Sequence, residues 1–491
     1  MMVSSQASTP HAVVVSSNGE GHINFAVRLS GSLTALGFHV SFIYFSSYYA
    51  KLRNMMRLVL PAAVETANVG DEDSIEQATA PGILRVRILE DGYEPGDVDN
   101  FFLVTPTMKE NLLRFVTEDR EEGISAPTCI VSDTLSPWTL EVAQRVGIPR
   151  VEFWASNAIS YLVFSNLDYL YSKGIFPEKG SPTRWKSEAP LILNHIQGLP
   201  EFPSELLPQE VRFGEPSDPF VQVFLNVESC AKYAERIFIN SLTELEPTAF
   251  NALKLLAIPA YGVGPLPNPV NKLSHGESEC LSWLDSQSDN SVVYVAFGSF
   301  ATLSTEEMHE LAFGLDASEC PFLWVIREDI CKREEVSQVL PKGFLERIDG
   351  KGLLVSWAPQ VQVLAHRSVG GFLSHCGWNS IIESLAGGVP LLSCPRMAEQ
   401  RLNCHWVCQQ WGVGVEMMRT DTGGLERNFV EIGIKALLHG TQGSQARSKA
   451  QEIMSLIAQS HSREGGTSVA NLEQFYDDMR VVCSKTSKSV L

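Results

Sequence analysis

A histidine after the first predicted strand and an aspartate at the end of a later one could together transfer a proton. His22 lies between a strand at His11–Ser16 and a helix at Ile23–Leu36. Asp133 ends the strand PTCIVSD, and in a parallel sheet both strand ends lie at the same edge. A carboxylate beside an imidazole fixes its tautomer and stabilises the imidazolium that forms when a hydroxyl is deprotonated. The pair therefore predicts general-base chemistry, with His22 as the base.

Each member of this pair also has a simpler explanation. A single histidine is more often structural, and an aspartate before a helix is often only a cap. The position of His22 at a helix start favours a neutral ring, because the helix dipole opposes the imidazolium. The surrounding GEGH segment is no dinucleotide fingerprint, since Asn24 stands where the third glycine should fall. A nicotinamide dehydrogenase is therefore the least favoured function.

A second group of candidate residues lies between Trp357 and Gln400 and could bind a nucleotide-sugar. The strand Gly370–Ser374 leads into a helix that runs to Ala386, and the free amides of a helix start suit a diphosphate. Trp357 could stack on a base, and Glu383 could bind ribose hydroxyls. Taken one at a time, these residues could equally be a core tryptophan, helix caps and a solvated loop. The other candidates in this group are His375, Gly377, Asn379, Ser380, Glu399 and Gln400.

Length and charge restrict the class of protein. A chain of 491 residues is long enough for two domains. Its 44% hydrophobic and 19% charged residues are typical of a soluble globular protein. The net charge of −19 argues against a nucleic-acid partner. No run approaches the roughly 18 apolar residues of a membrane span, and the N-terminal segment predicts a strand and no signal peptide.

The ten cysteines are scattered and lie mostly in apolar surroundings, which fits reduced thiols in the cytoplasm. Cys404, His405 and Cys408 have the residue types of a metal site, but on a helix His405 would point away from the two cysteines. We therefore expect no metal. A monomer is the default expectation, because no oligomerisation signal is visible.

Strands and helices alternate in both halves of the chain, which predicts an α/β protein with two doubly wound parallel sheets. Beyond the first strand, the N-terminal half has predicted strands at His39–Phe45, Pro127–Val131 and Arg150–Trp154, with a helix at Thr139–Val146. The C-terminal half has predicted strands at Ser291–Val295, Phe322–Ile326, Gly352–Ser356, Gly370–Ser374 and Pro390–Ser393, with a helix at Thr305–Ala317. Two Rossmann-like domains that face each other across a cleft are the simplest architecture.

The same pattern divides the chain into domains. We expect an acceptor-binding domain at residues 1–257, an interdomain linker rich in proline and glycine at 258–274, and a donor-binding domain at 275–464. Residues 465–491 are expected to form a helix that packs back on the first domain. Residues 157–227 are irregular and rich in aromatics and prolines, and we assign them to the acceptor pocket in preference to a surface insertion.

The segment WAPQVQVLAHRSVGGFLSHCGWNSIIESLAGGVPLLSCPRMAEQ, from Trp357 to Gln400, resembles the signature (PSPG) box of plant secondary-product UDP-glycosyltransferases of family 1. Similar landmarks elsewhere are CLSWLDSQSDNSVVYVAFGS, GLDASECPFLWVIRE, INSLTELEP, IQGLPEF and GGTSVANLEQF. This resemblance covers most of the chain and implies the GT-B fold. It also implies an inverting O-glycosyltransferase that moves glucose from UDP-glucose, without a metal, to a small lipophilic acceptor such as a flavonoid, another phenolic or a terpenoid.

The family's site residues carry over to the matching positions of this chain. His22 and Asp133 match its catalytic histidine and supporting aspartate. On the donor side, the resemblance places Trp357 and Ala358 on the uracil, Gln360 and Glu383 at the ribose, His375, Asn379, Ser380 and Ser299 at the phosphates, and Trp378, Glu399 and Gln400 on the sugar. Gln400 favours glucose, while galactose, xylose and rhamnose stay open.

Four positions depart from the family pattern. Phe25 stands at a usual proline, Glu399 at the commoner aspartate, Met397 where many relatives carry tryptophan, and Ala155 near a usual threonine, for which Ser156 could substitute. Two functions stay open beside the transferase. One is another nucleotide-sugar enzyme of this fold, such as an epimerase. The other is a non-catalytic binding relative, which would be expected to have lost the catalytic pair or the donor residues.

Overall fold

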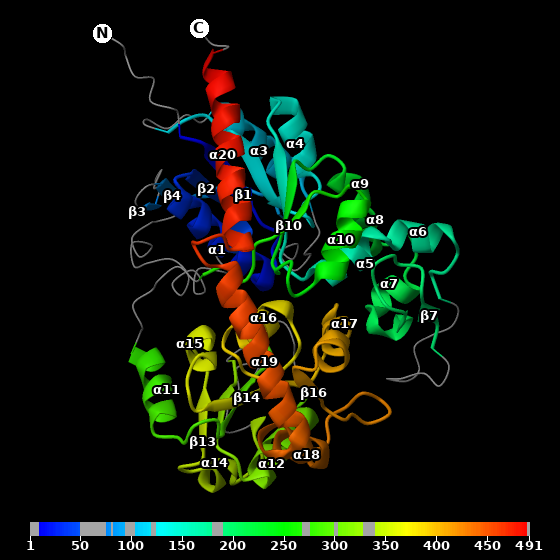
Figure 1. Cartoon of the computed structure of the whole chain (residues 1–491), viewed down its shortest axis with the longest axis vertical. Coiled ribbons are helices and arrows are strands. Elements are labelled where there is room, and N and C mark those ends of the chain that lie inside the picture. The colour runs from blue at the N-terminus through cyan, green and yellow to red at the C-terminus, as the bar shows by residue number, and fades with distance from the viewer. Residues whose placement is uncertain are drawn as a thin grey trace.

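Two parallel sheets, each covered by helices, form the two halves of the molecule (Figure 1). The computed structural model describes residues 9–49, 75–79, 82–93, 104–118, 124–178, 190–267, 275–298, 303–327 and 339–488. The expected architecture of two doubly wound α/β domains is confirmed. None of the described helices combines the length and the apolar character that crossing a bilayer requires.

The N-terminal sheet has the strand order β10-β9-β6-β5-β1-β2-β4-β3. Neighbouring strands run parallel along this order, except β4 and β3, which pair antiparallel. The bounds are β1 His11–Val15, β2 His39–Phe45, β3 Ile75–Thr79, β4 Gly82–Leu89, β5 Cys129–Asp133, β6 Arg150–Trp154, β9 Arg236–Ile239 and β10 Ala260–Gly262. The chain proceeds from β1 to β2 in one direction and from β5 to β6 in the other, so the winding reverses between β1 and β5.

The C-terminal sheet is parallel and has the order β13-β12-β11-β14-β15-β16. Its bounds are β11 Val292–Ala296, β12 Phe322–Val325, β13 Gly352–Val355, β14 Val369–Ser374, β15 Leu391–Ser393 and β16 Gly414–Glu416. Helices that cover it include α11 His275–Asp285, α12 Thr305–Ser318, α14 Phe344–Arg347, α15 Gln360–Leu364, α16 Trp378–Ala386, α17 Gln400–His405, α18 Arg427–His439 and α19 Thr441–Ser460. Here the winding reverses between β11 and β14.

Both faces of each sheet are buried, as parallel sheets require. Alternate residues of β1 show this: Ala12 and Val14 pack with α1 (Glu20–Leu36), whereas Val13 and Val15 pack with α3 (Pro106–Thr117) and α4 (Thr139–Val146). The helix α1 ends at Gly37, whose φ of 108° lies in the left-handed region that glycine adopts without steric cost. The continuous apolar runs in the sequence therefore became central strands, as predicted.

A helical lobe is formed by short helices within the described part of residues 157–227 and by the helix that follows, and the prediction of an irregular segment was wrong at these helices. The lobe contains α5 (Ala158–Ser165), α6 (Leu167–Ser172), α7 (Gln209–Phe213), α8 (Pro219–Leu225), α9 (Val227–Ala231), the short helix η3 (Ser204–Leu206) and the strand pair β7 (Ile192–Leu193) and β8 (Phe202–Pro203). Every residue of α5 is buried, so its sequence lacks the one-sided pattern that marks a surface helix. The other helices are too short to show a period.

The last helix, α20 (Thr467–Lys488), lies along the N-terminal domain (Figure 1). Phe475 stacks on Phe38 with ring centroids 5.3 Å apart and meets Phe238 edge-on at 5.2 Å. The strand β10 lies inside the segment predicted to be a linker, but it pairs with β9 and so belongs to the N-terminal sheet. Residues 268–274 of that segment lie outside the described residues.

Candidate active site

The candidate residues gather where the winding of each sheet reverses, at the carboxyl ends of the strands. Ligands of open α/β sheets bind at such points. In the N-terminal sheet, the loop after β1 leads to His22, and β5 ends at Asp133. In the C-terminal sheet, Gly298 follows β11 and His375 follows β14. Each domain therefore supplies one half of a single site.

His22 and Asp133, the pair that the sequence predicts to be catalytic, are in direct contact. His22 Nδ1 lies 2.7 Å from Asp133 Oδ2, and the aspartate side chain is fully buried while the histidine side chain is 24% exposed. Asp133 Oδ2 also accepts the Ser17 hydroxyl at 2.7 Å, and its Oδ1 accepts the backbone N–H of Leu135 at 2.9 Å. These donors fix the carboxylate. It therefore holds the proton on His22 Nδ1 and leaves Nε2 as the nitrogen that can accept one.

The electrostatic surroundings of the pair differ from the prediction. Burial lowers the His22 pKa, but the charge and hydrogen bond of Asp133, with a smaller effect of Glu399, raise that pKa above its usual 6.5. The helix dipole was expected to favour the neutral ring, and the carboxylates of Asp133 and Glu399 act in the opposite direction. Burial raises the Asp133 pKa, whereas His22, Ser17 and Leu135 lower it, and the net shift is downward. Each partner thus favours the charged form of the other.

His375, shortly before α16, is enclosed by two glycines, Gly377 on the same segment and Gly298 after β11. A Cβ on Gly377 would lie 2.3 Å from His375 Nε2, and a Cβ on Gly298 would lie 2.6 Å from the same nitrogen. Gly298 also has a φ of +69°. The close approach that we expected Gly377 to permit is therefore that of this ring. Burial lowers the His375 pKa to about 4, although a hydrogen bond to the Ala296 carbonyl opposes the shift. The imidazole is neutral near pH 7 and can donate a hydrogen bond without carrying a charge.

A hydrogen-bonded group surrounds Glu383 on the second turn of α16. Gln360 Nε2 donates to Glu383 Oε2 at 2.8 Å and to Ser380 Oγ at 3.1 Å. Gln360 Oε1 accepts the Tyr294 hydroxyl at 3.2 Å. The guanidinium of Arg28, on α1 of the other domain, pairs with Glu383 Oε1. The two residues predicted at the ribose, Gln360 and Glu383, are thus in direct contact.

Two aromatic residues of the donor segment have different surroundings. Trp357 is 40% exposed, which is compatible with stacking on a base, and Ala358 beside it is buried. Trp378 is only 3% exposed, and its Nε1 donates to the Asn240 carbonyl at 2.5 Å. The Trp378 side chain therefore joins the two domains, and its contact with a sugar stays a prediction.

Asn379 connects the donor helix to the catalytic loop. Its Nδ2 donates to the Gly21 carbonyl at 2.8 Å, next to His22. Its Oδ1 accepts from Asn240 Nδ2 at 2.8 Å, and Asn240 Nδ2 also donates to the Ala155 carbonyl at 3.1 Å. One hydrogen of the Asn379 amide is used in this chain of contacts and the other can face a phosphate.

Glu399 and Gln400 lie at the start of α17. The Ser156 hydroxyl donates to Glu399 Oε1 at 3.1 Å, so Ser156 lies beside a residue that the resemblance places on the sugar. Gln400 Oε1 accepts the backbone N–H groups of Arg396 and Met397 at 2.8 and 3.0 Å. The two backbone donors identify this atom as the oxygen. Gln400 can therefore present only its amide N–H groups to a ligand.

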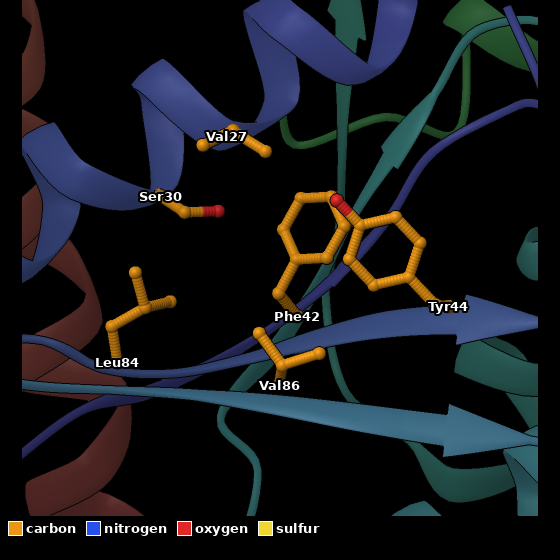
Figure 2. A pocket seen from close by; sticks show the side chains of 6 residues that line it. All are labelled: Val27, Ser30, Phe42, Tyr44, Leu84 and Val86. Carbon is orange, nitrogen blue, oxygen red and sulfur yellow. The ribbon is translucent and has the colours of Figure 1, made fainter. Parts of the chain in front are cut away.

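Two gaps lie beside α1 and help to delimit the site. Figure 2 shows the first, between Val27 and Ser30 on α1 and four side chains of β2 and β4; it has no room for a water molecule and is part of the core. The second is lined by Ser17, Asn18, Ile23 and Tyr48, among others, and has room for about one water. It adjoins Ser17, whose hydroxyl contacts Asp133.

Some predicted residues fall elsewhere. Ser299 lies outside the described residues. Phe25 is 1% exposed and packs on Phe153 with ring centroids 5.7 Å apart, so this departure from the family fills the core. Among the described residues, no group of three or more His, Cys, Asp or Glu is placed to hold a metal ion.

Sequence reasoning missed the interdomain residues Arg28 and Asn240. Arg28 is a lone cation in a largely apolar helix segment, which is a weak signal, and Asn240 lies in the landmark INSLTELEP. Neither position indicates a partner more than a hundred residues away.

Comparisons with known proteins find similar sequences over most of the chain. Residues 270–439 match the family model of UDP-glucoronosyl and UDP-glucosyl transferase. The chain is 32% identical to the (R)-mandelonitrile beta-glucosyltransferase of Prunus dulcis, with 94% of this chain and 96% of that protein covered. It is 33% identical to the 7-deoxyloganetin glucosyltransferase of Gardenia jasminoides, with 94% and 96% covered.

A solved structure shows the same arrangement of domains. It is Phytolacca americana UGT2 complexed with UDP-2fluoro-glucose and pterostilbene, which is 28% identical with a TM-score of 0.74. The match covers 96% of this chain and 99% of that one, so it extends over both sheets. The GT-B fold implied by the sequence is confirmed.

Proposed function

The chain belongs to the plant UDP-glycosyltransferases, and we propose that it transfers glucose from UDP-glucose to a hydroxyl of a small lipophilic metabolite with inversion at the anomeric carbon. The observation that carries this proposal is the His22–Asp133 contact of 2.7 Å, which lies against the start of α16 through the Gly21–Asn379 hydrogen bond. A base and a nucleotide-sugar site meet there.

The proton moves along a short path in this mechanism. His22 Nε2 takes the proton of the acceptor hydroxyl, whose oxygen attacks the anomeric carbon from the face opposite UDP. The bond from that carbon to the diphosphate breaks, and UDP leaves with the electron pair. Asp133 stabilises the imidazolium through its charge, as the raised His22 pKa indicates. An α-linked donor therefore gives a β-glucoside.

The donor half of the site is proposed from the same geometry. The exposed ring of Trp357 suits a uracil, with the Ala358 backbone beside it, and the Glu383–Gln360 pair suits the ribose. The amide of Asn379, the hydroxyl of Ser380 and the amides at Gly377 and Trp378 would donate to the diphosphate, and His375 and Ser299 are assigned there by resemblance. Glu399 and Gln400 would bind sugar hydroxyls, with Gln400 donating.

The acceptor site is proposed beside His22, with the helical lobe as its outer wall. The lobe presents a largely apolar interior, and Phe202 meets Trp406, next to α17, with ring centroids 5.8 Å apart. These side chains pack in the core of the lobe, and the lipophilic acceptor is proposed from the family resemblance. The relatives act on a cyanohydrin and on deoxyloganetin by their names, so a flavonoid is one candidate among phenolics and terpenoids. The proposed location is the cytoplasm, which fractionation of the tagged protein would check.

The test is a transfer assay with purified protein. UDP-glucose would be offered with flavonols, simple phenols, cyanohydrins and terpenoid alcohols, and products would be analysed by mass spectrometry for an added hexose. We expect adducts with at least one acceptor class and none with the variant His22→Ala. UDP binding without transfer to any acceptor would instead favour the non-catalytic relative, and free altered UDP-sugar would favour an epimerase.

A further inference from the structure

An arginine of the acceptor-side domain reaches the carboxylate that is proposed to bind the donor ribose. Arg28 lies on α1, the helix that also carries His22, and its Nη2 pairs with Glu383 Oε1 on α16. The two side chains are 14% and 7% exposed. A charge pair this well enclosed is weakly screened, and loss of either partner leaves the other charge buried alone.

The contacts of Glu383 leave a defined set of open acceptor positions. Arg28 occupies one position on Oε1, and Gln360 Nε2 occupies one on Oε2 at 2.8 Å. A carboxylate has about four such positions, two on each oxygen. Counting contacts from the described part of the chain, one position stays open on each oxygen, which matches the two neighbouring hydroxyls of a ribose. Because a cation and an amide hold opposite oxygens, the plane of the carboxylate cannot rotate away.

A second charged contact between the domains serves as a comparison. Glu20 and Arg327 approach only to 4.0 Å, and their side chains are 23% and 27% exposed. Longer distance and more solvent both weaken such a pair. The enclosed cation–carboxylate contact is thus at the ribose position, whereas the looser one lies nearer the catalytic loop.

We propose that Arg28 is a positioning residue for the donor ribose, which holds the Glu383 carboxylate in the orientation that accepts the two ribose hydroxyls. The inference rests on the proposed function, in which Glu383 binds the ribose. Since Arg28 and His22 share α1, recognition of an intact ribose then depends on the same element that positions the base. Arg28 makes nucleotide selection a property of both domains together.

The experiment compares two nucleotides by titration calorimetry. UDP and 2′,3′-dideoxy-UDP would be titrated into the wild-type protein, Arg28→Met, Arg28→Lys and Glu383→Gln. The wild type should prefer UDP by about tenfold or more, the order expected for hydrogen bonds to a charged group. In Arg28→Met, UDP affinity should fall about tenfold while dideoxy-UDP affinity stays within about twofold. Arg28→Lys should keep part of the preference, because lysine retains the charge without the planar fork.

A matched control separates this effect from a general loss of stability. Arg236 pairs with Asp478 where α20 meets the N-terminal sheet, and its side chain is 10% exposed. Arg236→Met removes an arginine–carboxylate pair of similar burial on the arginine side, far from the donor box in the sequence. Both nucleotide affinities should be unchanged in this variant. Circular dichroism and thermal unfolding would verify the fold of each protein.

Distinct outcomes would overturn the proposal. An equal loss of affinity for both nucleotides in Arg28→Met would show that Arg28 only holds the two domains together and has no role in ribose recognition. Tighter UDP binding in this variant would show that Arg28 competes with the ribose for Glu383. If Glu383→Gln kept the wild-type preference, Glu383 would not be the ribose ligand and the inference would fall with that assignment. A wild-type protein that binds neither nucleotide would contradict the proposed function itself.

Discussion

His22 Nδ1 and Asp133 Oδ2 lie 2.7 Å apart although 111 residues separate them along the chain. The two strands that carry them, β1 and β5, are direct neighbours in the sheet, with Val15 paired to Ser132. The contact is therefore a consequence of the winding, which reverses at this pair of strands. The same reversal in the other sheet places Gly298 against His375. Both halves of the site follow from one topological rule.

The raised His22 pKa predicts a specific pH dependence of transfer. His22 accepts a proton only when deprotonated, so kcat/KM should rise with pH through an apparent pKa above 6.5. Asp133→Asn removes the charge that raises this pKa. The rise should then shift to lower pH, while the plateau falls by about 10²- to 10⁴-fold. Initial rates at constant ionic strength from about pH 5 to pH 9 would measure both effects. A rise that keeps its midpoint in the variant would show that Asp133 does not set the pKa of the base.

Gly298 should tolerate alanine much less well than a matched glycine. Gly298 and Gly350 both have positive φ, 69° and 73°, but only at Gly298 would a Cβ meet the His375 ring; around Gly350 nothing lies within 4 Å. Gly350→Ala should lose about 1–2 kcal/mol of unfolding free energy from backbone strain alone. Gly298→Ala should lose about 1–3 kcal/mol more and bind UDP more weakly, because the ring must move. Urea unfolding and UDP titration would measure the two quantities. Equal results for the two variants would argue against the packing role.

Asn240 should affect catalysis through Asn379. Asn240→Ala removes the donor to Asn379 Oδ1 and to the Ala155 carbonyl, while the carbonyl that binds Trp378 stays. We expect a loss of about 1–2 kcal/mol in unfolding free energy and a fall of about tenfold in kcat/KM. Asn240→Asp keeps the size of the side chain but removes its N–H donor, so kcat/KM should fall at least as far in this variant. Steady-state kinetics with both variants would check this, and unchanged kcat/KM in both would remove Asn240 from the site.

Gln400 should contribute to sugar binding only as a donor. Its oxygen is held by the N–H groups of Arg396 and Met397. Gln400→Glu keeps an oxygen for these two groups and replaces the amide that faces the sugar by a second acceptor. The melting temperature should change little, whereas kcat/KM for UDP-glucose should fall by about tenfold or more. The affinity for UDP, which lacks the sugar, is the control and should stay within about twofold. Loss of UDP affinity would place Gln400 elsewhere in the site.

Local patterns were sufficient to predict many of the central strands and the contact of His22 with Asp133, whereas β4, β9 and β16 were not predicted and β10 fell in the predicted linker. The strands β2 and β6 and the helix α4 match their predicted bounds, because buried apolar runs between glycines and turns leave little choice. The contact of His22 with Asp133 followed from the rule that parallel strands share their carboxyl edge. The helical lobe was missed for the opposite reason, since helices buried all round, such as α5, carry no one-sided pattern.

Contacts between the domains could not be predicted from the sequence. Arg28 and Glu383 are 355 residues apart, and Asn240 and Asn379 are 139 apart. Each pair depends on how the two sheets are placed relative to each other, and no periodic pattern encodes that placement. The rise in the His22 pKa could not be predicted for the same reason. The helix dipole is a local effect, whereas the carboxylates of Asp133 and Glu399 come from distant segments.

The most direct test of the central claim is the transfer rate of His22→Ala, measured beside its affinity for UDP and beside the configuration of the wild-type product. We predict a β-glucoside from UDP-α-glucose by nuclear magnetic resonance, and in the variant a rate lower by about 10³-fold or more with UDP affinity within about twofold. An α-configured product, or a variant that transfers glucose at a rate near that of the wild type, would contradict the account of His22 as the base of a single displacement.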